Sequence, residues 1–305
     1  MQLRVGCEFQ YQSLSPTPAL VLVQPHPDLP HSVVREEWDL TPAVARHGYL
    51  DLFANRVERL TLPVGSSTLR YDAIVEVSRD PDPVALDAIE WGVQDLPDEV
   101  LVYTLASRYC LTESLSQVAW HLFGQVSPGW TRVQAICDWI NENIQYGLLQ
   151  STPLTTAIDV YVAGGGMCRD FAHLAITFCR CLNIPARYVF GYMPDIDVTG
   201  PQPRMDFHAW FEVYLGDRWW TFDARFNRPR IGRIPIGLGR DAVDVAMVTT
   251  YGAANFRSMV VWTDEVDGPG GEQPTVDRPA QSPGTSEGLI LGSGHDLRDH
   301  EAVPG

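Results

Sequence analysis

The chain has 305 residues, of which 45% are apolar and 10% aromatic, and its formal net charge at pH 7 is -16. This composition supports one large hydrophobic core or two modest ones. The acidic balance argues against sequence-independent binding to nucleic acid or to an anionic membrane surface, and favours cationic or neutral partners.

All basic residues are arginine, which most simply reflects a biased genome composition. The first residues lack the apolar run of a signal peptide, and no apolar run reaches the roughly 18 residues of a membrane span, so we expect a cytoplasmic protein. Six scattered cysteines without a framework of spacings fit a reducing compartment, and no disulfides are predicted.

Residues 1–80 are predicted to form a β-rich N-terminal domain, a small antiparallel sandwich. Short β-like runs alternate with turn residues, a pattern typical of such sheets. The expected strands cover residues 4–12, 19–23, 59–62 and 69–77. Pro81-Asp82-Pro83 breaks the pattern, and residues 81–96 are expected to link this domain to a second one.

The second domain is expected over residues 97–264, where the apolar spacing lengthens to a helical period. Residues 131–144 carry apolar side chains at three- and four-residue steps, which predicts an amphipathic helix beneath the site. A similar stripe begins at Cys168 and ends at Asn183-Ile184-Pro185. We therefore expect a buried helix that opens at Cys168.

Residues 187–192 and 205–215 are predicted strands, the second with strict alternation of apolar and polar side chains. A helix followed by an antiparallel sheet is an α+β arrangement, which is the predicted fold class. Residues 265–305 are rich in Gly, Pro, Ser, Asp and Glu and are expected to form a disordered tail. Its one apolar patch, Leu289-Ile290-Leu291, is either a docking segment or unfolded.

Cys168 is the first candidate for chemistry. It follows three glycines, 164–166, which permit a sharp backbone bend and keep side chains away from the sulfur. A thiol at a helix N-terminus also feels the helix dipole and free N–H groups, which favour the thiolate. The alternative is a small packing residue at a helix start.

His208 and Asp223 are placed together by hairpin register. If Gly216-Asp217 is a two-residue turn, Phe211 pairs with Phe222, and His208 and Asp223 become diagonal neighbours on one sheet face. A one-residue slip would turn Asp223 to the other face. The alternative for His208 is a strand histidine without a function.

These three residues have the chemical types of a nucleophile, its base and the base's orienter. We expect Cys168 to attack a carbonyl, His208 to take the thiol proton and Asp223 to fix the tautomer. The Cys168 backbone N–H is the first expected oxyanion donor, and the second is not identified. Asp206 and Arg225 lie near His208 in register, where they either tune the site or form an exposed ion pair.

Other patterns are weaker. Cys179-Arg180-Cys181 with His173 lacks zinc spacing, and the glycine run lacks the ending of a phosphate loop, so no metal and no cofactor are predicted. An aromatic cluster is expected to pack within the hairpin, with a substrate-binding shelf as the alternative. Its members are Trp210, Phe211, Trp219, Trp220 and Phe222.

Three motifs in order carry a family resemblance. Residues 166–172 (GMCRDFA), 207–212 (FHAWFE) and 219–225 (WWTFDAR) together resemble the bacterial transglutaminase-like superfamily, whose cores share a papain-like fold. The resemblance covers roughly residues 97–264, and residues 1–80 look like the β-rich domain that often precedes such a core.

The resemblance implies roles for the same three residues. Cys168, His208 and Asp223 match the family's nucleophile, base and orienter, and Phe226 stands where similar bacterial sequences often carry His. Bacterial members include cysteine peptidases, amidases and amine transferases. The expected architecture is an N-terminal β-sandwich followed by a papain-like core with helices packed on an antiparallel sheet.

We therefore expect a peptidase or amidase that cleaves an amide through a thioester, acting on a peptide or protein that carries an amide or glutamine side chain. One alternative is a transglutaminase that passes the acyl group to an amine, and the absence of lysine would then leave the enzyme no side-chain amine of its own to modify. Another is a non-catalytic scaffold that binds a peptide.

Overall fold

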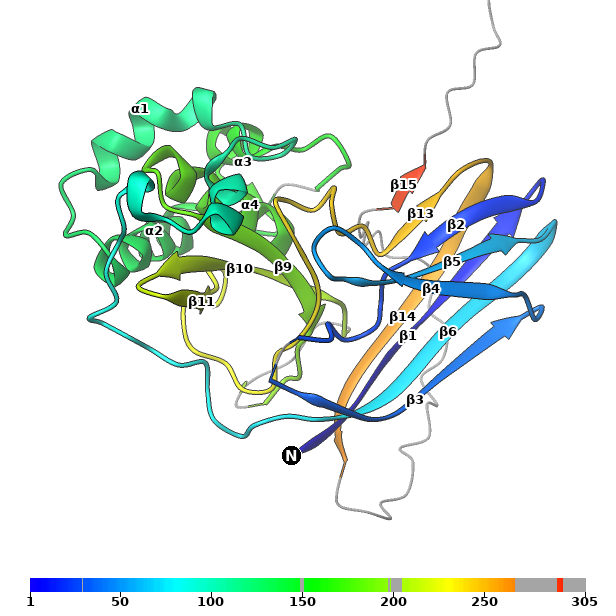
Figure 1. Cartoon of the computed structure of the whole chain (residues 1–305). Coiled ribbons are helices and arrows are strands. Elements are labelled where there is room, and N and C mark those ends of the chain that lie inside the picture. Colours follow the sequence, from blue (N-terminus) through cyan, green and yellow to red (C-terminus); the bar gives the residue numbers. More distant parts are fainter. Residues whose placement is uncertain (29, 149–150, 197, 199–204, 267–289, 293–305) are drawn as a thin grey trace, which may run out of the picture.

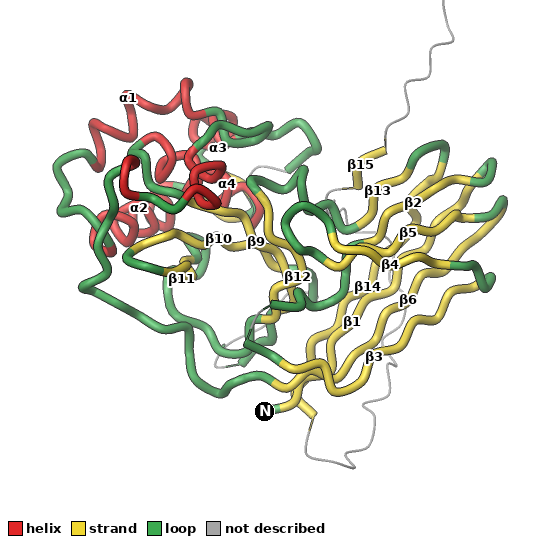
Figure 2. The backbone as a smooth tube through the Cα atoms, viewed as in Figure 1, coloured by secondary structure: helices red, strands yellow, loops and turns green. Residues whose placement is uncertain are grey.

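The computed structural model describes residues 1–28, 30–148, 151–196, 198, 205–266 and 290–292. The protein has two lobes, a β-sandwich and a mixed core of helices and strands (Figure 1). Figure 2 shows the described α-helices gathered in the core lobe, while the other lobe is built of strands. The predicted fold class, a sandwich followed by a papain-like α+β core, is confirmed.

The sandwich lobe consists of two sheets. Its strands are β1 (Gln2–Ser13), β2 (Thr17–Val21), β3 (Ser32–Thr41), β4 (Arg46–Leu50), β5 (Arg56–Leu62), β6 (Gly65–Glu76), β13 (Val248–Thr250), β14 (Ala254–Val266) and β15 (Ile290–Gly292). One sheet has the order β14-β1-β6-β3, and the other has the order β15-β13-β2-β5-β4. The strands pair antiparallel, except that β13 and β15 run parallel.

Burial explains which of these strands the sequence predicted. In β1, Leu3, Val5, Cys7, Phe9 and Tyr11 are buried and alternate with residues that, apart from the buried Gly6, are more exposed, so the period of two is visible in the sequence. Strands β3 and β4 were not predicted. They lie at sheet edges with almost entirely exposed side chains, so their sequences carry no buried face to recognise.

The end of the predicted core domain belongs to the sandwich. β14 pairs along the whole of β1, so residues 254–266 complete the N-terminal sheet, whereas the sequence assigned residues up to 264 to the core. Alternation in β14 shows that it is a strand but does not show which sheet it joins. Of the predicted tail, residues 265–266 lie in β14 and the backbone of 290–292 pairs with β13. The rest of that prediction lies outside the described residues.

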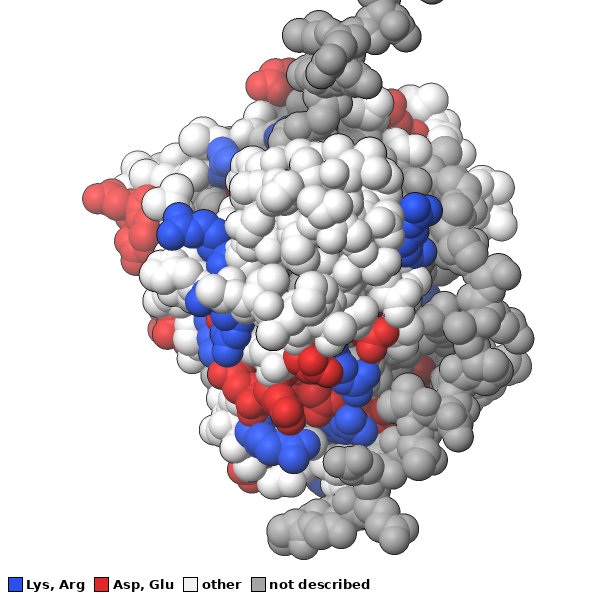
Figure 3. Space-filling view, turned by 90° about the vertical axis from the view of Figure 1, so that its right-hand side faces the viewer, with Lys and Arg blue, Asp and Glu red and all other residues white. Residues whose placement is uncertain are grey.

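The sandwich surface mixes both signs of charge. Asp72 lies 2.8 Å from Arg4, 3.8 Å from Arg70 and 3.9 Å from Arg35, and Arg70 also lies 3.3 Å from Glu8. Figure 3 shows acidic and basic side chains next to one another on the face that it presents. On this face the acidic side chains therefore do not form a continuous negatively charged surface.

The core lobe packs helices on a four-stranded sheet of order β11-β10-β9-β12. Its α-helices are α1 (Thr112–Phe123), α2 (Trp130–Asn143), α3 (Ala157–Ala163) and α4 (Cys168–Cys181). Its strands are β7 (Gln145–Tyr146), β8 (Gly165–Gly166), β9 (Ala186–Tyr192), β10 (His208–Leu215), β11 (Arg218–Phe222) and β12 (Ile234–Gly239). Two short 3-10 helices, η1 (Val93–Asp95) and η2 (Asp98–Thr104), come before α1 in the chain. Helix α2 confirms the predicted helix over residues 131–144.

Helix α4 is the centre of this lobe. It contacts α1, α2 and α3 as well as strands β9 and β10, and every residue from Arg169 to Cys181 is buried. Its buried cation Arg180 donates to the backbone oxygens of Leu105, Ala186 and Arg240, which offsets the cost of burying a charge. The predicted helix that begins at Cys168 is confirmed, and helices and strands of the core lobe pack around it.

Among the described residues, none of the helices combines the length and the apolar character that a membrane crossing requires.

Candidate active site

Cys168 is the first residue of α4, at the end of a tight connection from α3. Gly164 caps α3 with a φ of 67°, a left-handed conformation that glycine adopts without strain. Gly165 and Gly166 then pair in parallel with Gln145 and Tyr146. The predicted bend at the glycine run is therefore confirmed, and it turns the chain from one helix directly into the next.

Asp170 holds the start of α4. Its carboxylate accepts the Met167 N–H at 2.9 Å, the Ser151 hydroxyl at 2.9 Å and two N–H groups of Arg169 at 3.0 and 3.1 Å. A Cβ on Gly166 would lie only 2.8 Å from the Asp170 Cβ. Gly166 is thus required by the capping carboxylate, a reason that the sequence did not reveal.

The pKa of the Cys168 thiol is raised above its usual value. Burial is the main cause, and the carboxylates of Asp206 and Asp170 add to it, while the Arg225 charge and the Ala209 backbone N–H act in the opposite direction. The sequence predicted that the helix start would favour the thiolate. That prediction is wrong for the resting protein, because desolvation of the sulfur outweighs these favourable contributions.

The β10–β11 hairpin has the predicted register. Phe211 pairs with Phe222 and Leu215 with Arg218, around a turn in which Gly216 has a φ of 64°. The one-residue slip that would have turned Asp223 away does not occur.

His208 and Asp223 meet as this register predicts. Nε2 of His208 lies 2.8 Å from Oδ2 of Asp223, and their side chains are only 4% and 3% exposed. The other carboxylate oxygen, Oδ1, accepts the backbone N–H groups of Arg225 at 3.1 Å and Phe226 at 3.2 Å. Because Nε2 faces the carboxylate, Nδ1 is the ring nitrogen left to exchange a proton with a thiol.

The pKa values of this pair shift downward for different reasons. Burial lowers the pKa of His208, and the attraction of Asp223 offsets only part of that effect. Burial alone would raise the pKa of Asp223, but the charge of the His208 ring in its protonated form, the charge of Arg233 and the hydrogen bonds from both residues hold it well below its usual range. In the resting site the carboxylate is therefore ionised and the imidazole is neutral near pH 7.

The sulfur lies beside the strand that carries the histidine. The Ala209 backbone N–H, next to His208, acts to lower the pKa of the Cys168 thiol, and α4 packs on β10. The structure thus joins His208 to Asp223 directly and places Cys168 at the start of helix α4, which packs on the strand that begins at His208.

Arg225 and Asp206 act on the thiol in opposite directions, which favours the tuning interpretation over a remote exposed pair. The Arg225 guanidinium also lies 3.7 Å from the centre of the Tyr146 ring. Phe226 packs against the imidazole of His208, with ring centres 5.1 Å apart. An apolar ring thus covers one side of the imidazole.

The aromatic cluster of the hairpin packs, as predicted. Phe222 lies 5.9 Å from Phe211 and 4.5 Å from Trp130 of α2, measured between ring centres. Trp219 contacts Tyr103 and Tyr214 in edge-on geometry. These rings join the hairpin to the helices and so fix the position of Asp223.

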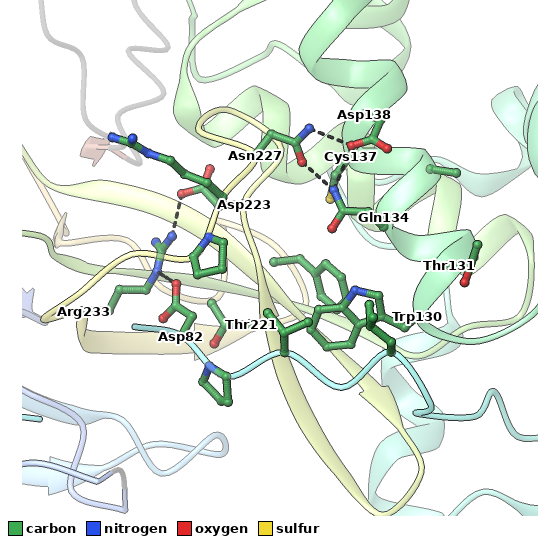
Figure 4. Close-up of a pocket in the computed structure, with 17 residues that line it drawn as sticks. Asp82, Trp130, Thr131, Gln134, Cys137, Asp138, Thr221, Asp223, Asn227 and Arg233 are labelled. Atoms are coloured by element: carbon green, nitrogen blue, oxygen red, sulfur yellow. Dashed lines mark hydrogen bonds and ion pairs between the residues drawn. The ribbon is translucent and has the colours of Figure 1, made fainter. Parts of the chain in front are cut away.

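Sequence reasoning missed Asp82 and Arg233. Arg233 donates to Oδ2 of Asp223 at 3.0 Å and to Oδ2 of Asp82 at 2.8 Å (Figure 4). Neither residue has a local signal, because Arg233 lies ten residues after Asp223 and Asp82 lies in the predicted linker. Only the fold brings them to the site.

A cavity of about 460 Å³ lies on another side of Asp223. It is walled by α2, the end of β11, residues 227–229, Arg233 and the chain around Asp82. Its polar end is built by Gln134, which donates to Asp138 and Asn227 at 2.8 Å each. Among the described residues its lining includes Asp223 but neither Cys168 nor His208, so the cavity reaches the site only through the carboxylate.

The described residues contain no group of three or more His, Cys, Asp or Glu side chains suited to hold a metal ion. The His173 ring lies between Tyr109, on which it stacks with ring centres 4.9 Å apart, and the tilted ring of Tyr188 at 5.0 Å.

Comparisons with known proteins identify the family of the chain. The model of the transglutaminase-like superfamily matches residues 117–224, which include all three candidate residues. A solved structure from Cytophaga hutchinsonii, named "Putative Cysteine Protease", is 30% identical in sequence, with 88% of this chain and 92% of that chain covered and a TM-score of 0.79. An uncharacterized protein of Mycobacterium leprae is 28% identical over 235 residues, which is 73% of this chain and 81% of the relative. An uncharacterized protein of Mycobacterium tuberculosis is 28% identical over 228 residues, which is 67% of this chain and 69% of the relative. The chain belongs to the transglutaminase-like superfamily.

Proposed function

We propose that this protein is a thiol-dependent amide hydrolase, a peptidase or amidase, with Cys168 as nucleophile, His208 as base and Asp223 as its orienter. The observation that carries the proposal is the buried 2.8 Å contact between His208 and Asp223, beside the helix that begins at Cys168. A carboxylate that fixes an imidazole next to a thiol is the arrangement that activates a cysteine for acyl transfer.

The pKa directions favour a thiol and a neutral imidazole as the resting state. As Sγ attacks the carbonyl carbon, the thiol proton moves to Nδ1 of His208, and Asp223 stabilises the imidazolium through Nε2–H. The negative charge develops on the carbonyl oxygen, towards which we assign the Cys168 backbone N–H as one donor.

Collapse of the tetrahedral intermediate breaks the C–N bond. His208 returns its proton to the departing amine, and the acyl group remains on Cys168 as a thioester. Water then attacks the thioester carbon while His208 takes a water proton. The C–S bond breaks, the carboxylic acid leaves, and the proton returns to the thiolate.

The substrate we propose is a peptide or protein amide, since hydrolysis through a cysteine thioester needs only an acyl donor and water. All six cysteines are free thiols, which agrees with a reducing compartment such as the cytoplasm.

Transfer to an amine, as in a transglutaminase, is the second candidate. It uses the same thioester, with an amine in place of water, and the observation in its favour is the absence of lysine. A non-catalytic peptide-binding scaffold is the third, and the assembled His208–Asp223 contact beside Cys168 argues against it.

The test is hydrolysis of a panel of peptide and amide substrates by wild type, Cys168→Ala and Cys181→Ser. Loss of the nucleophile should reduce hydrolysis by about 10⁴-fold or more. Cys181→Ser is the matched control, because Cys181 is another thiol of α4 whose sulfur contacts the Thr112 carbonyl oxygen at 3.3 Å, a contact that serine can keep. Equal rates in Cys168→Ala and wild type would refute the proposal.

The transferase candidate needs a separate assay. A glutamine-containing protein and a labelled primary amine are mixed with wild type and with Cys168→Ala. Incorporation of the amine above the Cys168→Ala level would establish transfer, and its absence in the presence of hydrolysis would leave water as the acceptor.

A further inference from the structure

Arg233 is a buried cation held between two carboxylates. Its Nη2 donates to Oδ2 of Asp223 at 3.0 Å and its Nε donates to Oδ2 of Asp82 at 2.8 Å. The Arg233 side chain is 5% exposed, and Figure 4 shows it between the two acidic side chains. The two carboxylates compensate the buried positive charge of the guanidinium, so removing either acid would leave that charge partly uncompensated.

Arg233 completes the hydrogen bonding of Asp223. Oδ2 is shared by His208 at 2.8 Å and Arg233 at 3.0 Å, while Oδ1 takes the N–H groups of Arg225 and Phe226. Each carboxylate oxygen thus has two donors, which uses its full accepting capacity. The Asp223 side chain cannot rotate without breaking several of these bonds at once.

Asp82 is itself fixed by the chain that carries Arg233. Its N–H donates to the Arg230 carbonyl oxygen at 2.9 Å, and its Oδ2 accepts the Arg230 N–H at 2.9 Å. Pro81 forms a β-bridge with Ile231. The chain that leaves the sandwich is therefore anchored beside the site, and it delivers one negative charge to Arg233.

The charge of Arg233 reaches His208 through the shared oxygen. The charged groups that act on His208 are Asp223, which favours the imidazolium, and Arg233 and Arg225, which disfavour it. The guanidinium also lies 4.9 Å from the centre of the Trp210 ring, which stacks on His208 at 6.1 Å. Asp82 offsets part of the Arg233 charge from the far side.

We propose that Arg233, held by Asp82, is a positioning residue of the triad: it fixes the rotamer of Asp223 and sets how readily His208 and Cys168 exchange a proton. This inference rests on the proposed function. It adds two opposite charges behind Asp223, the Arg233 guanidinium and the Asp82 carboxylate, and removing one or the other should shift the Cys–His pair in opposite directions.

The experiment measures the pH dependence of Cys168 alkylation by iodoacetamide, followed by mass spectrometry of the Cys168 peptide. The variants are Arg233→Gln, Arg233→Lys, Asp82→Asn and His208→Ala, each checked by circular dichroism and thermal denaturation. Removing a cation raises every apparent pKa of a coupled thiol–imidazole pair, whichever of its groups loses the first proton, and removing an anion lowers them.

We expect the alkylation profile to move to higher pH in Arg233→Gln, by about half a unit or more. It should move to lower pH, by a smaller amount, in Asp82→Asn. Arg233→Lys keeps the charge and should restore most of the wild-type profile. A role confined to folding would give shifts of the same sign, or none.

Shifts of the same sign, or an unchanged profile, in folded Arg233→Gln and Asp82→Asn would overturn the inference. If Arg233→Gln does not fold, Asp82→Asn decides: a downward shift supports the inference and an unchanged profile overturns it. The proposed function fails differently, because wild type would then alkylate no faster than His208→Ala at any pH.

Discussion

The two halves of the site are built on opposite principles. The His208–Asp223 half is buried, and its carboxylate is saturated by four donors. The Cys168 half begins a helix behind three glycines, and the cysteine side chain is half-buried. The proposed base and its orienter are therefore fixed in advance, while the proposed nucleophile stays partly exposed.

Electrostatics follow the same division. In the His–Asp half the cost of burying a carboxylate is offset by cations and N–H donors, so Asp223 stays ionised. In the cysteine half the Arg225 charge and the Ala209 N–H offset only part of the rise in the thiol pKa that burial causes, so the thiol keeps its proton. In the proposed mechanism the thiolate therefore forms as the thiol proton passes to His208 during attack.

Asp223→Asn breaks the fixed half most severely. An amide cannot stabilise the imidazolium and presents an N–H group to Nε2 or to Arg233, so we expect acylation of Cys168 to fall by about 10³- to 10⁴-fold. Single-turnover acylation, read by mass spectrometry with the best substrate of the panel, measures it. Asp217→Asn in the exposed hairpin turn is the control. Near-wild-type acylation in Asp223→Asn would show that the fixed half is not needed.

Asp170→Ala removes the carboxylate that holds the start of α4, next to Cys168. It removes the acceptor for the Met167 N–H and leaves the buried Arg169 without its carboxylate, so the free energy of unfolding should fall by about 3–5 kcal/mol. Urea denaturation measures the change. Asp159→Ala is the matched control, because Asp159 caps α3 in the same way but is exposed, and should cost about 1 kcal/mol. Equal losses would mean that the Asp170–Arg169 pair adds nothing beyond the cap.

His173 makes the helix beneath Cys168 sensitive to acid. Burial, together with the charges of Arg169 and Arg180, lowers its pKa well below the usual value, so the folded protein holds it neutral. The free energy of unfolding does not depend on this histidine above about pH 6.5, where the ring is neutral in both states. Below that pH the unfolded chain takes up a proton that the folded protein does not, so the free energy of unfolding falls by about 1.4 kcal/mol per pH unit.

His173→Gln should therefore flatten the decline of stability between about pH 6.5 and 5, although it lowers stability at pH 7. Denaturation curves at several pH values measure the slope, and His47→Gln on the exposed strand β4 is the control. A slope in His173→Gln as steep as in wild type would contradict the assignment.

Gly216→Ala tests the turn that sets the register of the fixed half, and its expected effect is the smallest. An added Cβ meets no atom within 4 Å, so the cost comes only from the φ of 64° and should be about 1 kcal/mol. Acylation should stay unchanged, since β10 and β11 remain in register. The control is Asp217→Ala at the next turn position. Loss of acylation would show that the turn, rather than the aromatic packing, holds Asp223 in place.

The sequence by itself determined the hairpin, the helix and the order of the three residues. Alternation over residues 205–215 and the Gly216-Asp217 turn fix which side chains share a face, because strand side chains repeat with a period of two. The apolar stripe after Cys168 fixes the buried helix. These are local rules, and the contact of His208 with Asp223 follows from them.

Only the tertiary structure decided what surrounds the triad. Arg233 and Asp82 come from loops with no periodic pattern, and β14 returns from the end of the core to pair with β1. The pKa of Cys168 depends on how much protein encloses the sulfur, which outweighs the local effect of a helix start. Partners far apart in sequence, and the dielectric environment they create, are set by packing and cannot be read from spacing alone.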